Sequence, residues 1–432
     1  MKKKAALHNL GCKVNAYETE AMQQLLEENG YEIVPFAPGA DVYVINTCTV
    51  TNIADRKSRQ MLHKAKKMNP GAVVVAAGCY VQAAKEEIEK DEAIDIVIGN
   101  NRKKDLVRIL EEHWEKGKQE EESVIDVNHT AEYEELSITR TAEHTRAYIK
   151  VQDGCNQFCS YCIIPYARGR VRSRQLSDVV SEVRGLAASG YQEVVLTGIH
   201  LSSYGIDHGT SLLELICAVN EIEGIRRIRL GSLEPRIITE EFVSVISGME
   251  KICPHFHLSL QSGCDATLKR MNRRYSTEEY YEKCQLLRKY FENPALTTDV
   301  IVGFPGETEE EFGETKKFLE KIMFYETHIF KYSRRKGTKA AVMENQVPDE
   351  IKSRRSAQLI ELGNKNQRAY EEAYIGKEAE VLFEERFIKD GEEYFSGHTK
   401  EYIRVAVRSK EDLTNKIRRI ILTESDFFAK ID

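Results

Sequence analysis

The strongest constraint on this chain is a loop that carries three thiols at a C-x3-C-x2-C spacing, Cys155, Cys159 and Cys162. The alternating run Ala147–Val151 precedes the loop and predicts a β-strand, so the cysteines follow a strand end. Such a short loop can fold three thiolates around one metal centre, and it offers no local fourth ligand. On a four-iron cluster, three thiolates leave one iron open to bind another ligand.

Zinc binding and a disulfide are the alternatives for this loop. Zinc usually takes four protein ligands in paired C-x2-C hooks, and no matching hook follows Cys162. The spacing, with Tyr161 just before the last cysteine, resembles that of the radical S-adenosylmethionine (SAM) enzymes. In that superfamily the open iron chelates SAM, and reductive cleavage of SAM yields a 5′-deoxyadenosyl radical. We therefore favour an iron–sulfur site.

The length and net charge of the chain limit its number of domains and the way in which it can contact nucleic acid. The chain has 432 residues and a formal net charge of −7, which predicts about three domains and restricts nucleic-acid contact to local basic patches. The sequence shows no apolar run long enough to span a bilayer, and Met1–Lys4 leads into a short strand rather than a signal peptide. We expect a cytoplasmic protein without a membrane partner. In that reducing compartment, the ten cysteines are better explained by metal binding or burial than by disulfides.

The first third of the chain contains four short apolar runs separated by polar helical segments: residues 5–8, 42–45, 73–76 and 96–98. Such runs predict a parallel sheet with helices on both faces. Cys12, Cys48 and Cys79 each follow one of the first three runs. Because the carboxyl ends of parallel strands lie along one edge, these thiols can meet and form a second three-thiolate cluster site. Three separately buried structural cysteines are the alternative.

The centre of the chain continues this alternation after the strand 147–151, with further strands at 193–198, 227–232, 255–260, 298–303 and 328–332. Six βα units predict a partial (βα)6 barrel with functional residues at the strand carboxyl ends and an open side for a large substrate. The charged run Lys116–Glu122 before it predicts a solvated linker.

The last part of the chain does not continue the alternation of strands and helices seen in the two parts before it. A long charged helix over 349–374 is followed by short alternating strands, which predict a small β-barrel. The predicted fold class is therefore α/β with a small carboxyl-terminal β-barrel. The predicted domains are residues 1–130, 141–371 and 374–432.

Small and polar residues end the strands of the predicted barrel. Glycines there permit close approach of a nucleoside to the backbone, and polar side chains can hydrogen-bond to SAM, although turns alone also favour such residues. The candidate SAM contacts are Tyr161, Thr197, Gly198, Glu234, Ser259, Gln261, Asp299 and Gly303.

Three basic runs follow the cluster loop, the fourth barrel strand and the sixth. A charge run is usually a solvated face, but three runs at equivalent barrel positions suit the binding of phosphate groups. The candidate contacts with the phosphates of a nucleic acid are Arg168, Arg170, Arg172, Arg174, Arg270, Arg273, Arg274, Arg334 and Arg335.

Over essentially its whole length the chain resembles the radical-SAM methylthiotransferases. The matching segments are Gly11–Asn15, Asn46–Cys48, Ala77–Cys79 and Cys155–Pro165. The resemblance implies a partial-barrel radical-SAM core, a carboxyl-terminal β-barrel called a TRAM domain, and two 4Fe-4S clusters. The auxiliary cluster would be held by Cys12, Cys48 and Cys79.

Two further segments, Lys13–Glu20 and Arg168–Arg174, look most like the branch that acts on N6-threonylcarbamoyladenosine beside the tRNA anticodon. This resemblance implies reaction at the adenine C2 position, whose C–H bond has no acidity for a side-chain base to exploit. One SAM would supply the radical, the auxiliary cluster would hold the inserted sulfur, and a second SAM would donate the methyl group. No catalytic side chain beyond the six cluster ligands is expected. The implied partners are the tRNA anticodon stem-loop, a reductant protein such as flavodoxin or ferredoxin, and a sulfur donor of unknown kind.

Three alternatives to this function remain at this point. The same chemistry can act on N6-isopentenyladenosine in tRNA or on a ribosomal-protein aspartate. A different class of function is a non-catalytic iron–sulfur electron carrier or RNA-binding module. A carrier needs neither an open iron nor a ring of strand ends suited to a nucleoside.

Overall fold

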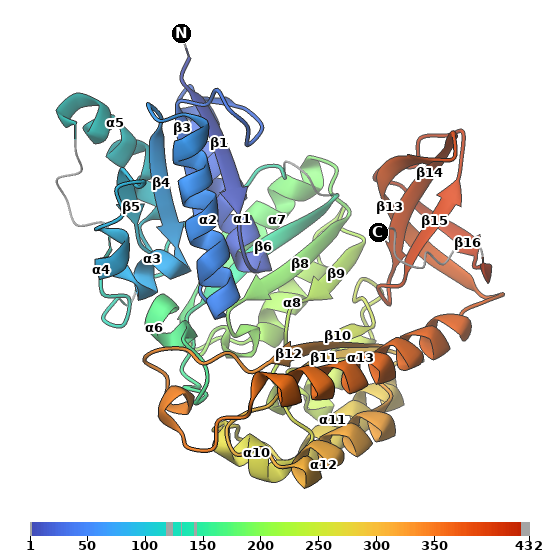
Figure 1. Ribbon diagram of the computed structural model, residues 1–432. Helices are drawn as coiled ribbons and strands as arrows, with labels where there is room; N and C mark the ends of the chain where they lie inside the picture. The colour runs from blue at the N-terminus through green and yellow to red at the C-terminus, as the bar shows by residue number, and fades with distance from the viewer. Residues whose placement is uncertain (1, 118–123, 131, 142–144, 425–432) are drawn as a thin grey trace.

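The computed structural model describes residues 2–117, 124–130, 132–141 and 145–424 (Figure 1). A parallel α/β domain comes first, an open barrel of parallel strands second and an antiparallel sheet last. None of the described helices combines the length and apolarity that a membrane crossing requires. Most of the charged run Lys116–Glu122 falls outside the described residues, and the predicted domain boundaries stay predictions.

Five parallel strands form the first sheet, in the order β2–β1–β3–β4–β5. Strands β3 and β4 are buried along their whole length because helices cover both faces. Met22 of α1 and Leu110 of α5 pack on one face, and Leu62 of α2 and Tyr80 of α3 pack on the other. The predicted parallel sheet is confirmed. Its elements are β1 (Lys4–Asn9), α1 (Lys13–Glu28), β2 (Glu32–Ile33), β3 (Val42–Thr47), α2 (Asn52–Met68), β4 (Val73–Gly78), α3 (Cys79–Ala83), α4 (Lys85–Ile88), β5 (Ile96–Ile98), η1 (Lys103–Asp105) and α5 (Leu106–Lys116).

Six parallel strands form the barrel, in the order β6–β8–β9–β10–β11–β12, and β7 pairs antiparallel at the edge of β6. Leu233 joins β9 to β10, since its N–H donates to the His257 carbonyl at 2.8 Å and its carbonyl accepts from the Ser259 N–H at 3.0 Å. The predicted partial barrel of six βα units is confirmed.

The barrel strands and their connecting elements are β6 (Arg146–Asp153), α6 (Ile164–Arg168), β7 (Arg172–Ser173), α7 (Leu176–Ala188), β8 (Glu193–Gly198), η2 (Leu201–Ser203), α8 (Leu212–Asn220), β9 (Arg227–Leu230), η3 (Pro235–Ile237), α9 (Glu240–Ser247), β10 (His255–His257), α10 (Asp265–Arg270), α11 (Thr277–Tyr290), β11 (Ala295–Val302), α12 (Glu309–Ile322), β12 (Glu326–Lys331) and η4 (Lys339–Val342).

Side chains alternate along the barrel strands between two environments. Ala147 and Ile149 of β6 join the apolar core under α7 and α8, whereas Lys150 points to the other face and meets Glu18 of α1 at 2.8 Å. Helix α1 thus lies over β6 and β8, and the amino-terminal domain covers part of the side that the six-stranded barrel leaves open.

The long helix α13 (Asp349–Glu372) leads to the last sheet, whose antiparallel order is β15–β14–β13–β16. A bulge between Phe383 and Glu385 shifts the register of β13 against β14, and the sheet curls into a TRAM-like half-barrel (Figure 1). The curl follows from the bulge, which adds local twist to a strand. The strands are β13 (Glu378–Lys389), β14 (Glu392–Thr399), β15 (Arg404–Arg408) and β16 (Ile417–Ile421).

This sheet packs against the amino-terminal ends of the barrel strands. Arg227 of β9 donates from Nη1 to the His398 carbonyl at 2.9 Å, and Arg229 donates to the Lys400 carbonyl at the same distance. The Tyr402 ring stacks on His255 of β10, with ring centroids 4.9 Å apart. The carboxyl-terminal sheet therefore closes the end of the barrel that lies opposite the cysteine loop.

Candidate active site

The three cysteines of the amino-terminal domain follow the carboxyl ends of three adjacent strands. Cys12 caps α1, Cys48 follows β3, and Cys79 begins α3. Burial raises the pKa of Cys48 to about 11, and the nearby charges of Cys79 and Cys12 act in the same direction. A Cβ on Gly11 would lie 3.0 Å from the Sγ of Cys48, so glycine at this position lets the two loops approach closely.

The other three cysteines lie on the loop after β6. The Gln157 backbone N–H donates to the Cys155 Sγ at 3.5 Å, and Arg273 donates from Nη1 to the Cys159 Sγ at 3.3 Å. Burial raises the pKa of Cys155 to about 11 and that of Cys162 to about 12. N–H donors directed at sulfur are among the features that tune iron–sulfur clusters.

Neither cysteine triad has the geometry of a single-ion site. A zinc ion bound by thiolates at about 2.3 Å requires sulfur atoms only roughly 4 Å apart. Within the described residues, no cysteine belongs to a group whose ligand atoms all lie within 4.8 Å of one another. The wider separation and the all-thiol donor sets fit a larger iron–sulfur cluster.

A buried ion network joins the two triads through Arg168. Its Nε donates to the Cys79 Sγ at 3.1 Å, and its Nη1 donates to Glu18 of α1 at 2.7 Å. The same Nη1 lies 3.2 Å from the carboxylate of Asp153, two residues before Cys155. Burial opposes the charge on this guanidinium, but Cys79 and Glu18 raise the pKa of Arg168 well above its usual value. The loop of one triad is thus fixed to the strand that carries the other.

The predicted SAM contacts lie at the carboxyl-terminal end of the barrel. The charge of Glu234 acts on the Cys155 thiol, and the ring of Tyr161 packs edge-on against Phe304, with centroids 6.4 Å apart. The Ser259 carbonyl accepts from Arg273 at 3.3 Å. The remaining candidates lie in or just after β8, β10 and β11: Thr197, Gly198, Gln261, Asp299 and Gly303. Their contact with SAM stays a prediction.

Two of these glycines have another reason to be glycine. A Cβ on Gly303 would lie 2.3 Å from the Cγ of Lys352, and one on Gly198 would lie 2.8 Å from the Gln152 side-chain oxygen. Close packing against these side chains is therefore a second reason for glycine at both positions, and the contact of these glycines with a nucleoside stays a prediction.

The nine predicted tRNA contacts divide by exposure. Arg170, Arg274 and Arg334 are exposed, and Arg270 and Arg273 are half-buried. The others are buried: Arg168, Arg172, Arg174 and Arg335.

The buried arginines bind protein groups. Arg174 pairs with Glu182 of α7, Arg172 donates to the Arg168 carbonyl at 2.9 Å, and Arg335 meets Asp55 of α2 at 2.6 Å. An enclosed guanidinium does not reach a phosphate in this conformation. The structure therefore gives these four arginines an internal role in place of the predicted tRNA contact.

The inner wall of the barrel holds a polar cluster of three residues, of which the sequence analysis singled out only Asp299, as a candidate SAM contact. His257, Asp299 and His328 come from three neighbouring strands, and their ligand atoms lie within 4.8 Å of one another. Asp299 is directly opposite His328 in the register of β11 and β12. The alternation of inward and outward side chains along a strand could have identified these residues, because His257 and Asp299 occupy inward positions of strands that were correctly predicted.

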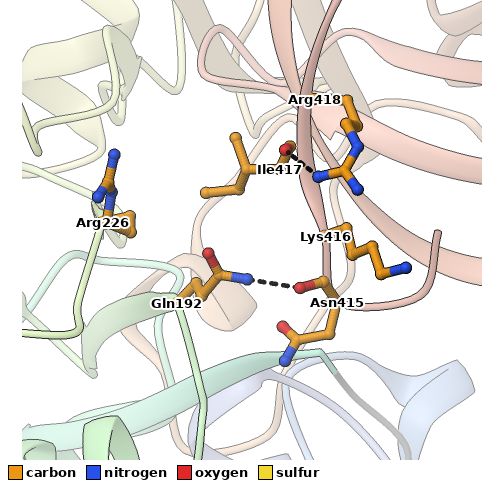
Figure 2. Close-up of a pocket in the computed structure, with 6 residues that line it drawn as sticks. All are labelled: Gln192, Arg226, Asn415, Lys416, Ile417 and Arg418. Atoms are coloured by element: carbon orange, nitrogen blue, oxygen red, sulfur yellow. Dashed lines mark hydrogen bonds between the residues drawn. The ribbon is translucent and has the colours of Figure 1, made fainter.

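A separate groove of about 330 Å³ lies where the barrel meets the carboxyl-terminal sheet (Figure 2). Gln192 bridges its two sides by donating to the Asn415 carbonyl at 2.5 Å. The groove lies at the amino-terminal ends of β8 and β9, away from the cysteines, and is no part of the candidate active site. Its lining residues are Gln192, Arg226, Asn415, Lys416, Ile417 and Arg418.

Comparison with known proteins identifies the family. Residues 4–99 match the model described as Uncharacterized protein family UPF0004, and residues 149–319 match the Radical SAM superfamily. The chain is 42% identical to the Threonylcarbamoyladenosine tRNA methylthiotransferase MtaB of Bacillus subtilis strain 168, across 98% of this chain and 94% of that protein. The chain belongs to the radical SAM tRNA methylthiotransferases.

This methylthiotransferase is also similar to relatives with another printed substrate. It is 36% identical to the tRNA-2-methylthio-N(6)-dimethylallyladenosine synthase of Carboxydothermus hydrogenoformans, across 97% of this chain and 96% of that protein. Family membership implies a 4Fe-4S cluster, SAM and a tRNA substrate. The two relatives differ in the substituent on the adenosine.

The fold of the methylthiotransferase is shared more widely. The radical SAM methyltransferase TsrM from Kitasatospora setae superposes with a TM-score of 0.59 at 16% identity, covering 79% of this chain and 74% of that one. At this identity the likeness concerns the fold alone.

Proposed function

We propose that this chain methylthiolates the C2 position of N6-threonylcarbamoyladenosine next to the tRNA anticodon, giving 2-methylthio-N6-threonylcarbamoyladenosine. The observation that carries the proposal is the 42% identity to the threonylcarbamoyladenosine enzyme over nearly the full length of both chains. The corresponding value for the dimethylallyladenosine synthase is 36%.

The chemistry of the barrel wall supports the same choice. A dimethylallyl (isopentenyl) group is purely apolar, whereas a threonylcarbamoyl group carries a carboxylate, a hydroxyl and amide groups. The inner wall presents His257, Asp299 and His328, and burying an apolar group against such side chains would leave their polar atoms without partners.

Cys155, Cys159 and Cys162 would hold the SAM-binding 4Fe-4S cluster. Once bound, that cluster with SAM supplies the carbon radical that removes the unreactive C2 hydrogen. Arg273 holds the Cys159 sulfur from one side at 3.3 Å, and the Ser160 N–H donates to the Met271 carbonyl at 3.0 Å. These contacts fix the loop to the segment after β10, so the three sulfurs keep their positions relative to the strand ends.

Cys12, Cys48 and Cys79 would hold the auxiliary 4Fe-4S cluster and present the sulfur to be inserted. Two donors flank Cys79, namely Arg168 at 3.1 Å and the Asn100 amide at 3.6 Å. Through Arg168 and Asp153 the position of this triad is coupled to the cluster loop. The protein thereby holds its two reaction centres at a constant separation.

The tRNA would bind around the carboxyl-terminal end of the barrel. The Arg170 guanidinium lies 4.5 Å from the centre of the Phe158 ring, and Tyr166, exposed at 46%, packs edge-on against Phe158. Aromatic rings and arginine planes of this kind suit the stacking of unpaired bases. Exposed Arg274 and Arg334 suit contact with phosphates.

The test is mass spectrometry of tRNA nucleosides from cells with and without the gene. We expect the 2-methylthio-N6-threonylcarbamoyl nucleoside to disappear and its unmodified parent to accumulate. Loss of the 2-methylthio isopentenyl nucleoside instead would move the chain to the other tRNA substrate. If neither nucleoside changes, methylthiolation of a ribosomal-protein aspartate becomes the leading function.

The reaction would take place in the cytoplasm, with a flavodoxin or ferredoxin as reductant.

A further inference from the structure

The starting observation is the polar cluster of His257, Asp299 and His328 on the neighbouring strands β10, β11 and β12 (Figure 1). One ligand atom from each residue lies within 4.8 Å of the other two, and no other group of three His, Cys, Asp or Glu side chains does so in the part of the chain that the structure describes. The register produces this meeting, because His257 lies opposite Thr297 and Asp299 lies opposite His328. Side chains two residues apart on a strand share one face, so all four lie on the inner wall.

The ring of His257 is held with one nitrogen directed toward Asp299. Its Nδ1 is hydrogen-bonded to the Thr297 hydroxyl at 3.0 Å, and its Nε2 lies 3.3 Å from the Asp299 carboxylate. Although Nε2 is buried, it forms no hydrogen bond with a described residue. When Nδ1 donates its proton to the hydroxyl, Nε2 presents a lone pair, and two acceptors then face each other. This arrangement is costly unless a cation joins them.

Other histidines of this chain meet carboxylates in the ordinary way. His63 is hydrogen-bonded to Asp91 at 2.8 Å, and His398 to Glu384 at 3.2 Å. The distance from His257 to Asp299 would also suit a hydrogen bond, so the direction of the ring and not the distance prevents one. The pair is therefore set apart from the ordinary histidine–carboxylate pairs of the same protein.

His328 supplies the third group of the cluster. Its ring stacks on that of His257, with centroids 5.7 Å apart and planes 23° apart. Neither its ring nitrogens nor the Asp299 carboxylate is hydrogen-bonded to a residue within the described ranges. The His328 side chain is also exposed, so it can rotate toward a shared ligand and close the remaining gap.

The donor set and its spacing suit a metal ion. Histidine nitrogen and aspartate oxygen bind such ions at about 2.0–2.2 Å, which places neighbouring ligand atoms roughly 3.0–3.5 Å apart. The 3.3 Å between His257 and Asp299 falls in this range. Two imidazoles and one carboxylate, without sulfur, are typical ligands of divalent transition metals such as zinc, iron and manganese. Three protein ligands leave at least one coordination position open.

We propose that His257, Asp299 and His328 form a binding site for one divalent transition-metal ion, separate from the two cysteine triads. The ion neutralises Asp299 and keeps an open position for an oxygen atom of a bound molecule. Thr297 is a positioning residue, because its hydroxyl fixes the ring of His257. This assignment replaces the predicted contact of Asp299 with SAM, and it is independent of which adenosine substituent the enzyme accepts.

The experiment is equilibrium dialysis of the holoenzyme with both clusters loaded. The protein is dialysed against Mn²⁺ in the presence of excess Mg²⁺, and the metals bound per chain are counted by mass spectrometry. The loaded clusters occupy the six thiolates, and Mg²⁺ fills sites made of oxygen alone. We expect one Mn²⁺ per chain. Zn²⁺ should displace it at a lower concentration, because zinc binds a given site of this kind more tightly than manganese.

Variants of single residues locate the ion. Asp299→Asn and His328→Phe each remove one ligand and should weaken Mn²⁺ binding by more than about 100-fold. Thr297→Val removes only the group that orients His257 and should weaken it by about 10-fold, as for other residues that hold a ligand in place. His63→Phe, the same substitution at another exposed histidine, is the matched control and should bind Mn²⁺ as the wild type does.

Thermal unfolding provides a second measurement. Mn²⁺ should raise the melting temperature of the wild type and of His63→Phe, and leave those of Asp299→Asn and His328→Phe unchanged. Equal iron content per chain in all variants would show that both clusters are retained. The two ligand variants change different strands, so either one that folds is sufficient for the test.

Two results would overturn the inference. One is a wild-type protein that binds neither Mn²⁺ nor Zn²⁺ under these conditions, which would leave the cluster as a polar wall without a metal. The other is equal binding in the wild type and in folded Asp299→Asn or His328→Phe, which would mean an adventitious ion only. Neither result bears on the identity of the tRNA substrate, which the nucleoside analysis decides separately.

Discussion

Arg168 donates a hydrogen bond from its Nε to the Sγ of Cys79 over 3.1 Å. The same guanidinium binds Glu18 of α1 at 2.7 Å and Asp153 of β6 at 3.2 Å. It belongs to a segment that the sequence analysis treated as a surface for tRNA. Its contacts instead make it the link between the amino-terminal domain and the barrel.

Replacement of Arg168 by methionine should therefore disturb both domains. The change leaves Glu18 and Asp153 buried without one of their cations, and breaking a buried ion pair typically costs about 3–5 kcal/mol. We expect a lower free energy of unfolding in denaturant titrations and a loss of sulfur insertion that exceeds the loss of SAM cleavage. Arg170→Met, at the exposed neighbouring position, is the control. Equal unfolding midpoints for the two variants would contradict the linking role.

The two cysteine triads predict separable defects. Cys155→Ala should abolish release of 5′-deoxyadenosine from SAM, because the cluster that binds SAM loses a ligand. Cys12→Ala should spare that release and abolish methylthiolation. Both products can be followed by chromatography in the same anaerobic reaction. Methylthiolation retained in a Cys12 variant that no longer holds its auxiliary cluster would contradict the two-cluster assignment.

We expect a side chain at position 154 to clash severely with the backbone at the start of the loop that carries Cys155, Cys159 and Cys162. Its φ of +72° suits glycine, and a Cβ there would lie 1.8 Å from the Arg170 carbonyl oxygen. We expect Gly154→Ala to destabilise the fold by more than about 4 kcal/mol and to lower the iron content per chain.

Gly185 provides the matched control for that substitution. It lies in α7 with nothing within 4 Å of the added Cβ, so Gly185→Ala should stabilise the helix by up to about 1 kcal/mol. Thermal unfolding measures both variants. Similar melting temperatures for the two would show that the loop adjusts to the added atom.

We expect Arg274 to contribute electrostatically to the binding of tRNA. Arg274 is exposed beside the half-buried Arg273 that holds Cys159. If it neutralises one phosphate, Arg274→Gln should weaken binding of the anticodon stem-loop and reduce the slope of log K against log salt by about 1. Fluorescence anisotropy at several salt concentrations measures this slope. Arg184→Gln on α7, also exposed, should leave it unchanged, and an unchanged slope for Arg274→Gln would remove this arginine from the interface.

Much of the fold followed from local patterns. The strands of the first sheet and of the barrel are short apolar runs with a regular spacing, and parallel packing brings their carboxyl ends together whatever the helices between them contain. That rule is also why Cys12, Cys48 and Cys79, far apart in the sequence, were predicted to meet. The pattern missed β2 and β7, because two-residue strands are too short to show a period.

The roles of individual charged side chains did not follow from the sequence. Arg168, Arg172 and Arg174 are buried while Arg170 between them is exposed, since their partners come from α1, α7 and the segment after α5. The polar cluster of His257, Asp299 and His328 depends in the same way on the register between strands. Such contacts are tertiary, and spacing along the chain does not encode them.

The carboxyl-terminal sheet has a mechanical consequence through Tyr402. Its ring stacks on both His255 and His398, and the guanidinium groups of Arg146 and Arg229 lie 5.0 Å and 4.7 Å from its centre. Through these contacts the carboxyl-terminal sheet closes the end of the barrel that lies opposite the cysteine loop. Because Tyr402 contacts residues of β6, β9 and β10 at once, a displacement of the carboxyl-terminal sheet would move the strands whose opposite ends lead to the cysteine loop and the other candidate site residues.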